Sequence, residues 1–193
     1  MTPTLLPFML FALVASISPG PTNLLILARG ASLGLRATLA PVMAACTAAA
    51  AIVLVVGLGM GELLLRHPLA RQLMTWGGVL WLTWLAWQLL RSPAGVDSRA
   101  GGRGFDALNA AALQVINPKV WLMAVAVIGV FATPSVAVWQ LALLFLLIAL
   151  PCMAAWALLG AGSARWLAPR RMRVFNQVLA LALLVSAWAA VLL

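Results

Sequence analysis

Residues 18–23 read Ser-Pro-Gly-Pro-Thr-Asn and lie within a strongly apolar stretch near the start of the chain. A proline has no backbone N–H and fixes φ, so two prolines around a glycine interrupt helical hydrogen bonding. The carbonyl groups that lose their partners are costly in lipid unless they face protein, water or a ligand. This segment therefore predicts a broken helix, and the apolar residues around it predict that the helix lies in a membrane.

The composition supports a membrane protein. Of the 193 residues, 65% are hydrophobic and 8% are charged, and the mean hydropathy is +1.12. An ordinary soluble domain has roughly 25% charged residues, which it needs to cover its surface. The composition excludes a soluble enzyme, a secreted disulfide scaffold and a disordered tail. Because the apolar runs are long, they favour helices over a β-barrel, and we expect an all-α integral membrane protein.

Six apolar stretches approach the roughly 20 residues that a helix needs to cross a bilayer. We expect spans near residues 4–28, 38–61, 73–90, 107–132, 136–160 and 176–193. No Lys or Arg precedes the first stretch, whereas a cleavable signal peptide begins with a basic segment. We therefore expect the first span to be retained.

Basic residues between the spans predict the orientation, because cytoplasmic loops are enriched in Lys and Arg. The first, third and fifth gaps hold nine of them: Arg29, Arg36, Arg91, Arg99, Arg103, Arg165, Arg170, Arg171 and Arg173. The gaps on the other side hold Arg66 and Arg71. This asymmetry places the odd-numbered gaps in the cytoplasm and both termini outside. It also explains the net charge of +9 better than nucleic-acid binding does.

The chain is expected to form a single transporter domain, residues 1–193, of two three-helix repeats. Repeat 1 covers about 4–90, a Gly-rich cytoplasmic linker about 91–106, and repeat 2 about 107–193. The sequence Pro-x-Met-Ala-Ala occurs at 41–45 and again at 151–155. Three spans per repeat would insert the second repeat upside down, as in the inverted repeats of secondary transporters.

A second proline break occurs in the fourth span, at Ile-Asn-Pro-Lys, residues 116–119. That span runs opposite to the first, so the two breaks are expected at similar depth. A helix that restarts after a break presents free amides, which suit an anionic group such as a carboxylate. Lys119, the only lysine, adds a buried positive charge there. Asn23 and Asn117 would bind an amine, a hydroxyl or freed backbone groups.

The Pro-Gly-Pro-x-Asn run at 19–23, followed by Asn-Pro-Lys at 117–119, resembles the LysE/RhtB family of amino-acid exporters. The resemblance covers the whole chain, including its length and its three-plus-three layout. It implies a bacterial inner-membrane protein that exports amino acids, driven by the proton-motive force, with no cofactor. It also implies that the functional centre contains Pro19, Gly20, Pro21, Asn23, Asn117, Pro118 and Lys119.

Coupling to protons needs a protonatable group, and the sequence leaves its identity open. The three acidic residues are Glu62, Asp97 and Asp106, and none falls clearly within a span. Glu62, at the outer end of the second span, would have to fold inward. Otherwise Lys119 or the substrate itself would titrate, or the coupling would not involve protons.

Three other functions fit parts of the sequence. A membrane thiol carrier needs two nearby cysteines, but Cys46 and Cys152 lie in different spans, away from both proline breaks. A heavy-metal or inorganic-ion exporter would use sulfur ligands, which Met43, Met153 and the two cysteines would supply. A non-transporting structural subunit would have no need for two broken helices and a buried lysine.

The substrate and the oligomeric state are not readable from the sequence. No acid lies clearly within the membrane to neutralise a second positive charge, so neutral amino acids are favoured, such as threonine, homoserine or branched-chain ones. The spacing of Gly57 and Gly61 is typical of helices that approach closely. That spacing would suit a homo-oligomer.

Overall fold

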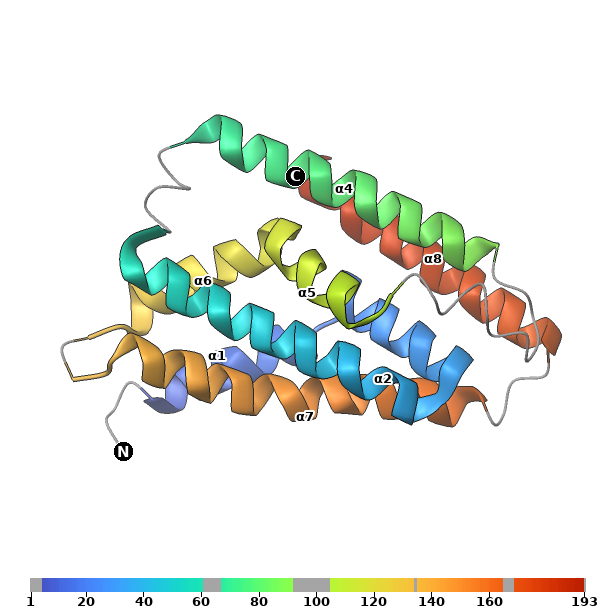
Figure 1. The fold of residues 1–193 in the computed structure, drawn as a ribbon, viewed down its shortest axis with the longest axis horizontal. Coiled ribbons are helices and arrows are strands. Elements are labelled where there is room, and N and C mark those ends of the chain that lie inside the picture. The colour runs from blue at the N-terminus through green and yellow to red at the C-terminus, as the bar shows by residue number, and fades with distance from the viewer. Residues whose placement is uncertain (1–4, 61–66, 92–104, 134, 165–168, 193) are drawn as a thin grey trace.

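The computed structural model describes residues 5–60, 67–91, 105–133, 135–164 and 169–192. Every element in this part of the chain is helical, which confirms the predicted all-α fold. In chain order the elements are α1 (Leu5–Ile17), α2 (Pro21–Val55), η1 (Val56–Met60), α4 (Pro68–Leu90), α5 (Ala107–Ile116), α6 (Pro118–Phe131), α7 (Val138–Ala164) and α8 (Pro169–Leu192) (Figure 1).

Helix α2 consists of two segments that meet at Gly34. Gly34 has φ +80°, a conformation that side chains other than glycine rarely adopt. The chain reverses direction there (Figure 1). Across the turn, Arg29 Nε donates to the carbonyl of Ala37 at 2.9 Å. The apolar stretch Pro21–Gly59 has 39 residues. As one straight helix it would be about 58 Å long, nearly twice the thickness of the hydrocarbon core.

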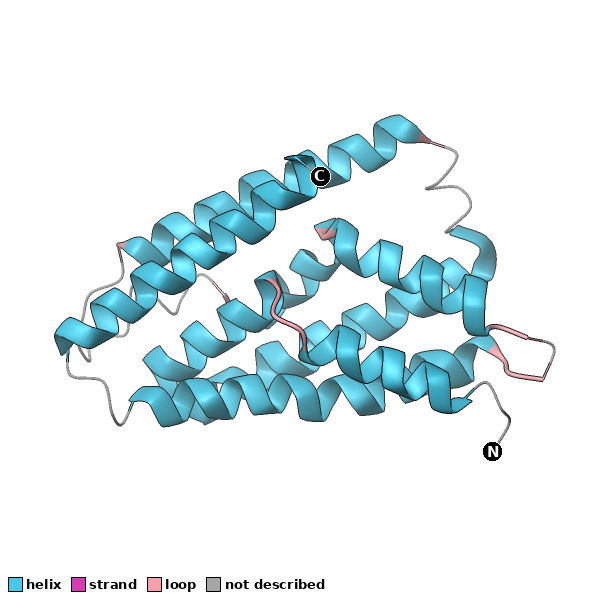
Figure 2. Cartoon of the chain, turned by 180° about the vertical axis from the view of Figure 1, so that it is seen from behind, coloured by secondary structure: helices cyan, strands magenta, loops and turns pink. Residues whose placement is uncertain are grey.

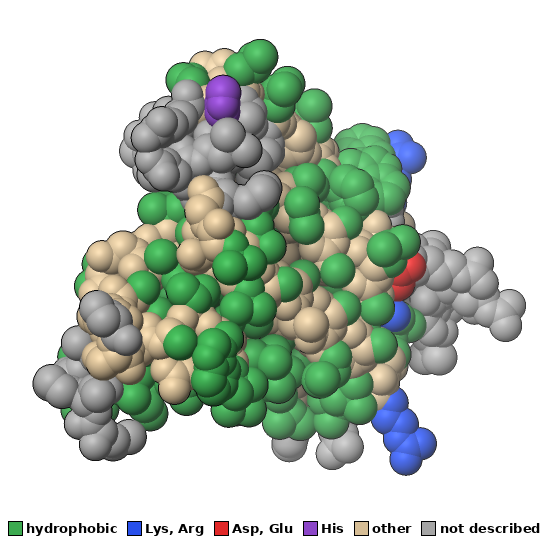
Figure 3. Space-filling model, turned by 60° about the vertical axis from the view of Figure 1, so that its left-hand side comes forward, with side chains coloured by type: hydrophobic (Ala, Val, Ile, Leu, Met, Phe, Trp, Pro, Cys, Tyr) green, Lys and Arg blue, Asp and Glu red, His purple; other side chains and the backbone are tan. Residues whose placement is uncertain are grey.

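In the described part of the chain, two helical stretches are long and apolar enough to cross a bilayer, Pro21–Gly59 and Val138–Ser163. The pair α5 and α6 qualifies as a third if it is counted as one span, bent by 64°. Large apolar side chains cover much of the surface, and in Figure 3 the described charged side chains gather near one edge. A surface of this kind suits lipid rather than water.

The core forms where α2 packs against α7, with α1, α5 and α6 against them. Glycines allow this close approach. A Cβ on Gly30 would lie 2.6 Å from the carbonyl oxygen of Ala157, and a Cβ on Gly160 would overlap the carbonyl oxygen of Leu27. Helices α4 and α8 pack mainly on each other and form a separate pair beside this core (Figures 1 and 2).

The two Pro-x-Met-Ala-Ala segments have different surroundings. Pro41 is buried inside α2, whereas Pro151 is exposed on α7. Met43 is 52% exposed and Met153 only 9%. The shared sequence therefore does not give its two copies equivalent positions in the core.

Candidate functional site

The first helix break lies between Ile17 and Pro21, as the two prolines predicted. Its freed carbonyl groups are paired by side chains. Asn23 Nδ2 donates to the carbonyls of Ser16 and Ser18, at 2.9 and 2.8 Å. The indole of Trp156 on α7 donates to the carbonyl of Ile17 at 3.2 Å. These bonds remove the main cost of interrupting a helix in lipid.

The amide side of the same break is arranged differently. Gly20 is the N-cap of α2 and provides no side-chain acceptor for the first turn. The first amides of a helix have no partner within that helix and carry a partial positive charge. The start of α2 therefore keeps the capacity to bind an anion.

The second break centres on Asn117, between the end of α5 and the start of α6 at Pro118. Asn117 Oδ1 accepts from the backbone N–H of Lys119 at 3.1 Å, so Asn117 caps α6 with its own side chain. The indole of Trp121 donates to the carbonyl of Val115 at 2.8 Å. The sequence predicted free amides after both breaks, but here a side chain already occupies one of them.

The structure brings the two breaks together. Gln114 Nε2 on α5 donates to Thr22 Oγ1 on α2 at 3.0 Å. Lys119 Nζ lies 3.4 Å from Ser18 Oγ. A Cβ on Gly20 would lie 3.1 Å from the same ammonium nitrogen, so glycine leaves the room that Lys119 occupies. Gly20 has φ −164°, which any residue can adopt, so space rather than backbone conformation favours glycine here.

The sequence predicted that Lys119 lies buried within a membrane span, and the structure shows how this side chain lies relative to the rest of the folded chain. The side chain is exposed on the surface of the folded chain. Because α6 begins at Pro118, Lys119 falls in the first helical turn, next to the gap that the break opens. Its ammonium projects toward the first break rather than into packed protein.

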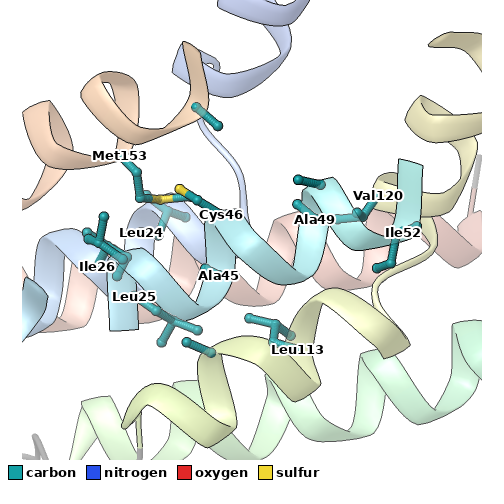
Figure 4. Packing of buried hydrophobic residues seen from close by; sticks show 14 of the residues in the cluster. Leu24, Leu25, Ile26, Ala45, Cys46, Ala49, Ile52, Leu113, Val120 and Met153 are labelled. Atoms are coloured by element: carbon teal, nitrogen blue, oxygen red, sulfur yellow. The ribbon is translucent and has the colours of Figure 1, made fainter. Parts of the chain in front are cut away.

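A cavity of about 70 Å³ opens between the breaks. Its polar lining comes from the residues in and next to both breaks: Ser16, Gly20, Thr22, Asn23, Gln114, Asn117 and Lys119. Its apolar lining comes chiefly from α2 and α7: Ala45, Cys46, Ala49, Phe145, Ala149 and Met153. Figure 4 labels Ala45, Cys46, Ala49 and Met153. The arrangement can hold a small molecule that has both a charged and an apolar part.

Of the predicted residues, Gly20, Pro21, Asn23, Asn117 and Lys119 line the cavity. Pro19 and Pro118 belong to the breaks, which they shape by withholding a backbone donor. Glu62, the proposed coupling residue, lies outside the described residues.

Sequence reasoning missed three polar residues of this lining, Ser16, Thr22 and Gln114. The hydroxyl of Ser16 is buried and has no hydrogen-bond partner among the described groups. Gln114 is 3% exposed. A buried amide in an apolar helix, three residues before a proline break, was the available signal.

The four sulfur-containing residues that a metal exporter would use are not all brought together. Cys46 and Met153 lie at the cavity, with Met153 reaching toward Cys46 (Figure 4). Cys152 is buried on α7, but Met43 is exposed. Among the described residues, no three His, Cys, Asp or Glu side chains lie close enough to hold one metal ion.

Comparison with known proteins identifies the family. The model of the LysE type translocators matches residues 13–192 of this chain. The chain belongs to the LysE type translocator family. It is therefore an integral membrane protein and a transporter rather than an enzyme, and the family predicted from the sequence is confirmed.

Curated relatives are efflux proteins. The chain is 34% identical over 138 residues to the cysteine/O-acetylserine efflux proteins of Escherichia coli strain K12 and Shigella sonnei strain Ss046. It is 32% identical over 137 residues to the protein of the same name from Escherichia coli O1:K1. Each match covers 70% of this chain and 69% of the relative. No solved structure gives a significant match.

Proposed function

We propose that this chain exports small amino acids of zero net charge from the cytoplasm. The relatives are named for efflux of cysteine and O-acetylserine, and both molecules are zwitterions with uncharged side chains. Threonine, homoserine and short branched-chain amino acids share that charge. The family membership supports translocation, and the chemistry of the cavity supports this class of substrate.

The observation that carries the proposal is the ammonium of Lys119 beside the uncapped start of α2. Together they suit a carboxylate, the group that all amino acids share. The carbonyl and amide oxygens around the breaks suit the α-ammonium group. Among the described lining residues, Lys119 carries the only charged side chain. A lysine or arginine substrate would thus bring a second positive charge that nothing there neutralises, at a high desolvation cost.

For the membrane arrangement we propose six spans, in two inverted repeats, in a bacterial inner membrane with both termini outside. The distribution of arginines supports this orientation.

Arg36 and Ser135 are both exposed and lie in gaps predicted to face opposite sides. In Arg36→Cys, a membrane-impermeant thiol reagent should react only from the cytoplasmic side. In Ser135→Cys it should react only from outside. The reverse pattern would contradict the orientation, and the parent chain, with buried Cys46 and Cys152, serves as the control.

We propose the proton-motive force as the energy source, with Glu62, Lys119 or the substrate carrying the proton. Proteoliposomes with an imposed pH gradient test this directly. The gradient should drive substrate accumulation, and a protonophore should abolish it. Accumulation that survives the protonophore would exclude proton coupling.

The proposed function is tested by measuring export of all twenty amino acids and O-acetylserine from cells that overproduce the chain. We expect faster export of a few neutral members and no change for lysine or arginine. If membrane insertion is verified and no amino acid is exported faster, the proposal is wrong. A gain in tolerance to metal ions instead would favour an inorganic-ion exporter.

A further inference from the structure

We propose that the apolar lining of the cavity is the pocket for the substrate side chain, and that its residues set the size limit of transport. This inference rests on the proposed function. The pocket residues are Ala45, Cys46 and Ala49 on α2, and Phe145, Ala149 and Met153 on α7.

Helical spacing gathers these residues on one face of each helix. Residues 145, 149 and 153 recur every four positions, and residues 45 and 46 lie four and three positions before residue 49, which places them on the same face one helical turn away. All six are buried, with exposed fractions between 0% for Ala45 and 9% for Met153. Figure 4 shows Cys46, Ala49 and Met153 in this region, where α2 and α7 lie side by side. The pocket wall is therefore part of the packed core.

The polar lining and the apolar lining would bind different parts of the substrate. The polar groups come from the helix breaks, so the carboxylate and ammonium of an amino acid would lie there. Its side chain would then extend toward α2 and α7. The described pocket residues carry no formal charge, so a charged side chain would lose its hydration without gaining a partner. The thiol of Cys46 and the thioether of Met153 are weakly polar and polarizable, which suits short side chains containing sulfur, an ester or a hydroxyl.

The size limit follows from which residues are small. Ala49 and Ala149 contribute single methyl groups to the wall, whereas Phe145 contributes a ring. A larger residue at position 49 would fill space that the side chain of the substrate needs. A smaller residue at position 145 would add space. Even one methylene in an apolar pocket changes discrimination by about 10–200-fold.

The test uses two variants with opposite effects on pocket volume. The purified chain is reconstituted in proteoliposomes, and transport of alanine, cysteine, O-acetylserine, methionine and leucine is measured separately. In Ala49→Leu, the rate for the larger members should fall at least about tenfold relative to alanine. In Phe145→Ala, transport of methionine and leucine should rise relative to cysteine, by a similar factor.

Matched controls lie two residues away on the same helices. Ala51 on α2 and Leu147 on α7 are exposed, so Ala51→Leu and Leu147→Ala should leave the selectivity profile unchanged. If Ala49→Leu fails to insert, Phe145→Ala decides alone. The pocket assignment is wrong if each pocket variant changes the transport rates of all five amino acids by the same factor. It is also wrong if the control variants shift the selectivity as much as the pocket variants do. If the parent chain transports none of the five, the proposed function itself fails.

Discussion

The two helix breaks use an asparagine for opposite purposes. Asn23, after the first break, donates to carbonyl groups at the end of the preceding helix. Asn117, within the second, accepts from an amide at the start of the following helix. At the first break, the amides at the start of α2 therefore have no side-chain cap. At the second break, the side chain of Lys119 extends toward the first break. A binding site for an anion arises only when the two are combined.

This comparison teaches that similar motifs need not be equivalent sites. Each proline break frees carbonyls on one side and amides on the other. The position of the asparagine relative to the prolines determines whether its side chain pairs with the carbonyl groups or with the amide groups of the break. At the first break the free set is positive in character, and the second break contributes a cation next to it.

The largest expected effect is that of Asn23→Asp, and Asn117→Asp is its matched control. Asn23→Asp removes the donor and faces two carbonyl oxygens with a carboxylate, at a cost of about 1–3 kcal/mol for each unpaired group. Asn117→Asp keeps the acceptor, and aspartate caps a helix about as well as asparagine. Thermal unfolding in detergent should show a large loss of stability for Asn23→Asp and little change for Asn117→Asp. Equal losses would mean that the two asparagines have the same role.

The second prediction concerns Lys119, which connects the two breaks. Lys119→Met keeps the chain length and removes the charge, and a hydrogen bond to a charged group is worth about 1.5–3 kcal/mol. We expect the apparent KM for export to rise about ten- to a hundredfold while the protein still inserts.

Lys119→Arg is the matched variant, and it should replace lysine poorly because a planar guanidinium differs from a compact ammonium. If Lys119 merely extends toward the membrane surface, arginine should work as well as lysine and methionine should cost little. Normal affinity in Lys119→Met would exclude the carboxylate site described here.

A smaller effect is expected from Gly20→Ala. The added methyl group would lie 3.1 Å from Lys119 Nζ and would displace the flexible end of that side chain by a few tenths of an ångström. Apparent affinity should fall several-fold, which is a smaller loss than that expected for Lys119→Met. The free energy of unfolding should not change, because φ at this position is one that any residue can adopt. Gly129 on α6 has open space around it, so Gly129→Ala is the control and should transport normally. Equal transport by both variants would show that Lys119 does not depend on the room at Gly20.

The smallest effect is expected at the hydrogen bond between Gln114 and Thr22. Thr22→Val removes the acceptor but keeps the shape, and Gln114 retains a second bond to the carbonyl of Ala110 at 3.1 Å. The loss should be about 0.5–1.5 kcal/mol of unfolding free energy. A double-mutant cycle with Gln114→Leu measures the coupling. Strictly additive effects would mean that this bond does not hold the breaks together.

Local chemistry allowed the sequence to predict much of the framework. Pro19, Pro21 and Pro118 each lack a backbone donor, so the breaks fall where the prolines stand. The low charge content required an apolar surface, and the long apolar runs required helices. Five of the seven predicted residues line the cavity because they lie in or next to those breaks. These results depend on neighbouring residues along the chain, which a sequence displays directly.

The tertiary structure alone decided which residues meet. Gln114 and Thr22 are 92 residues apart, and their contact depends on how α5 packs against α2. Packing also determined that Met153 is buried while Met43, in the same short motif, is exposed. The close crossing of α2 and α7 at Gly30 and Gly160 positions the apolar wall of the cavity. Such contacts arise from the fit of whole helix surfaces, which no local pattern specifies, and they combine two separate helix breaks into one site.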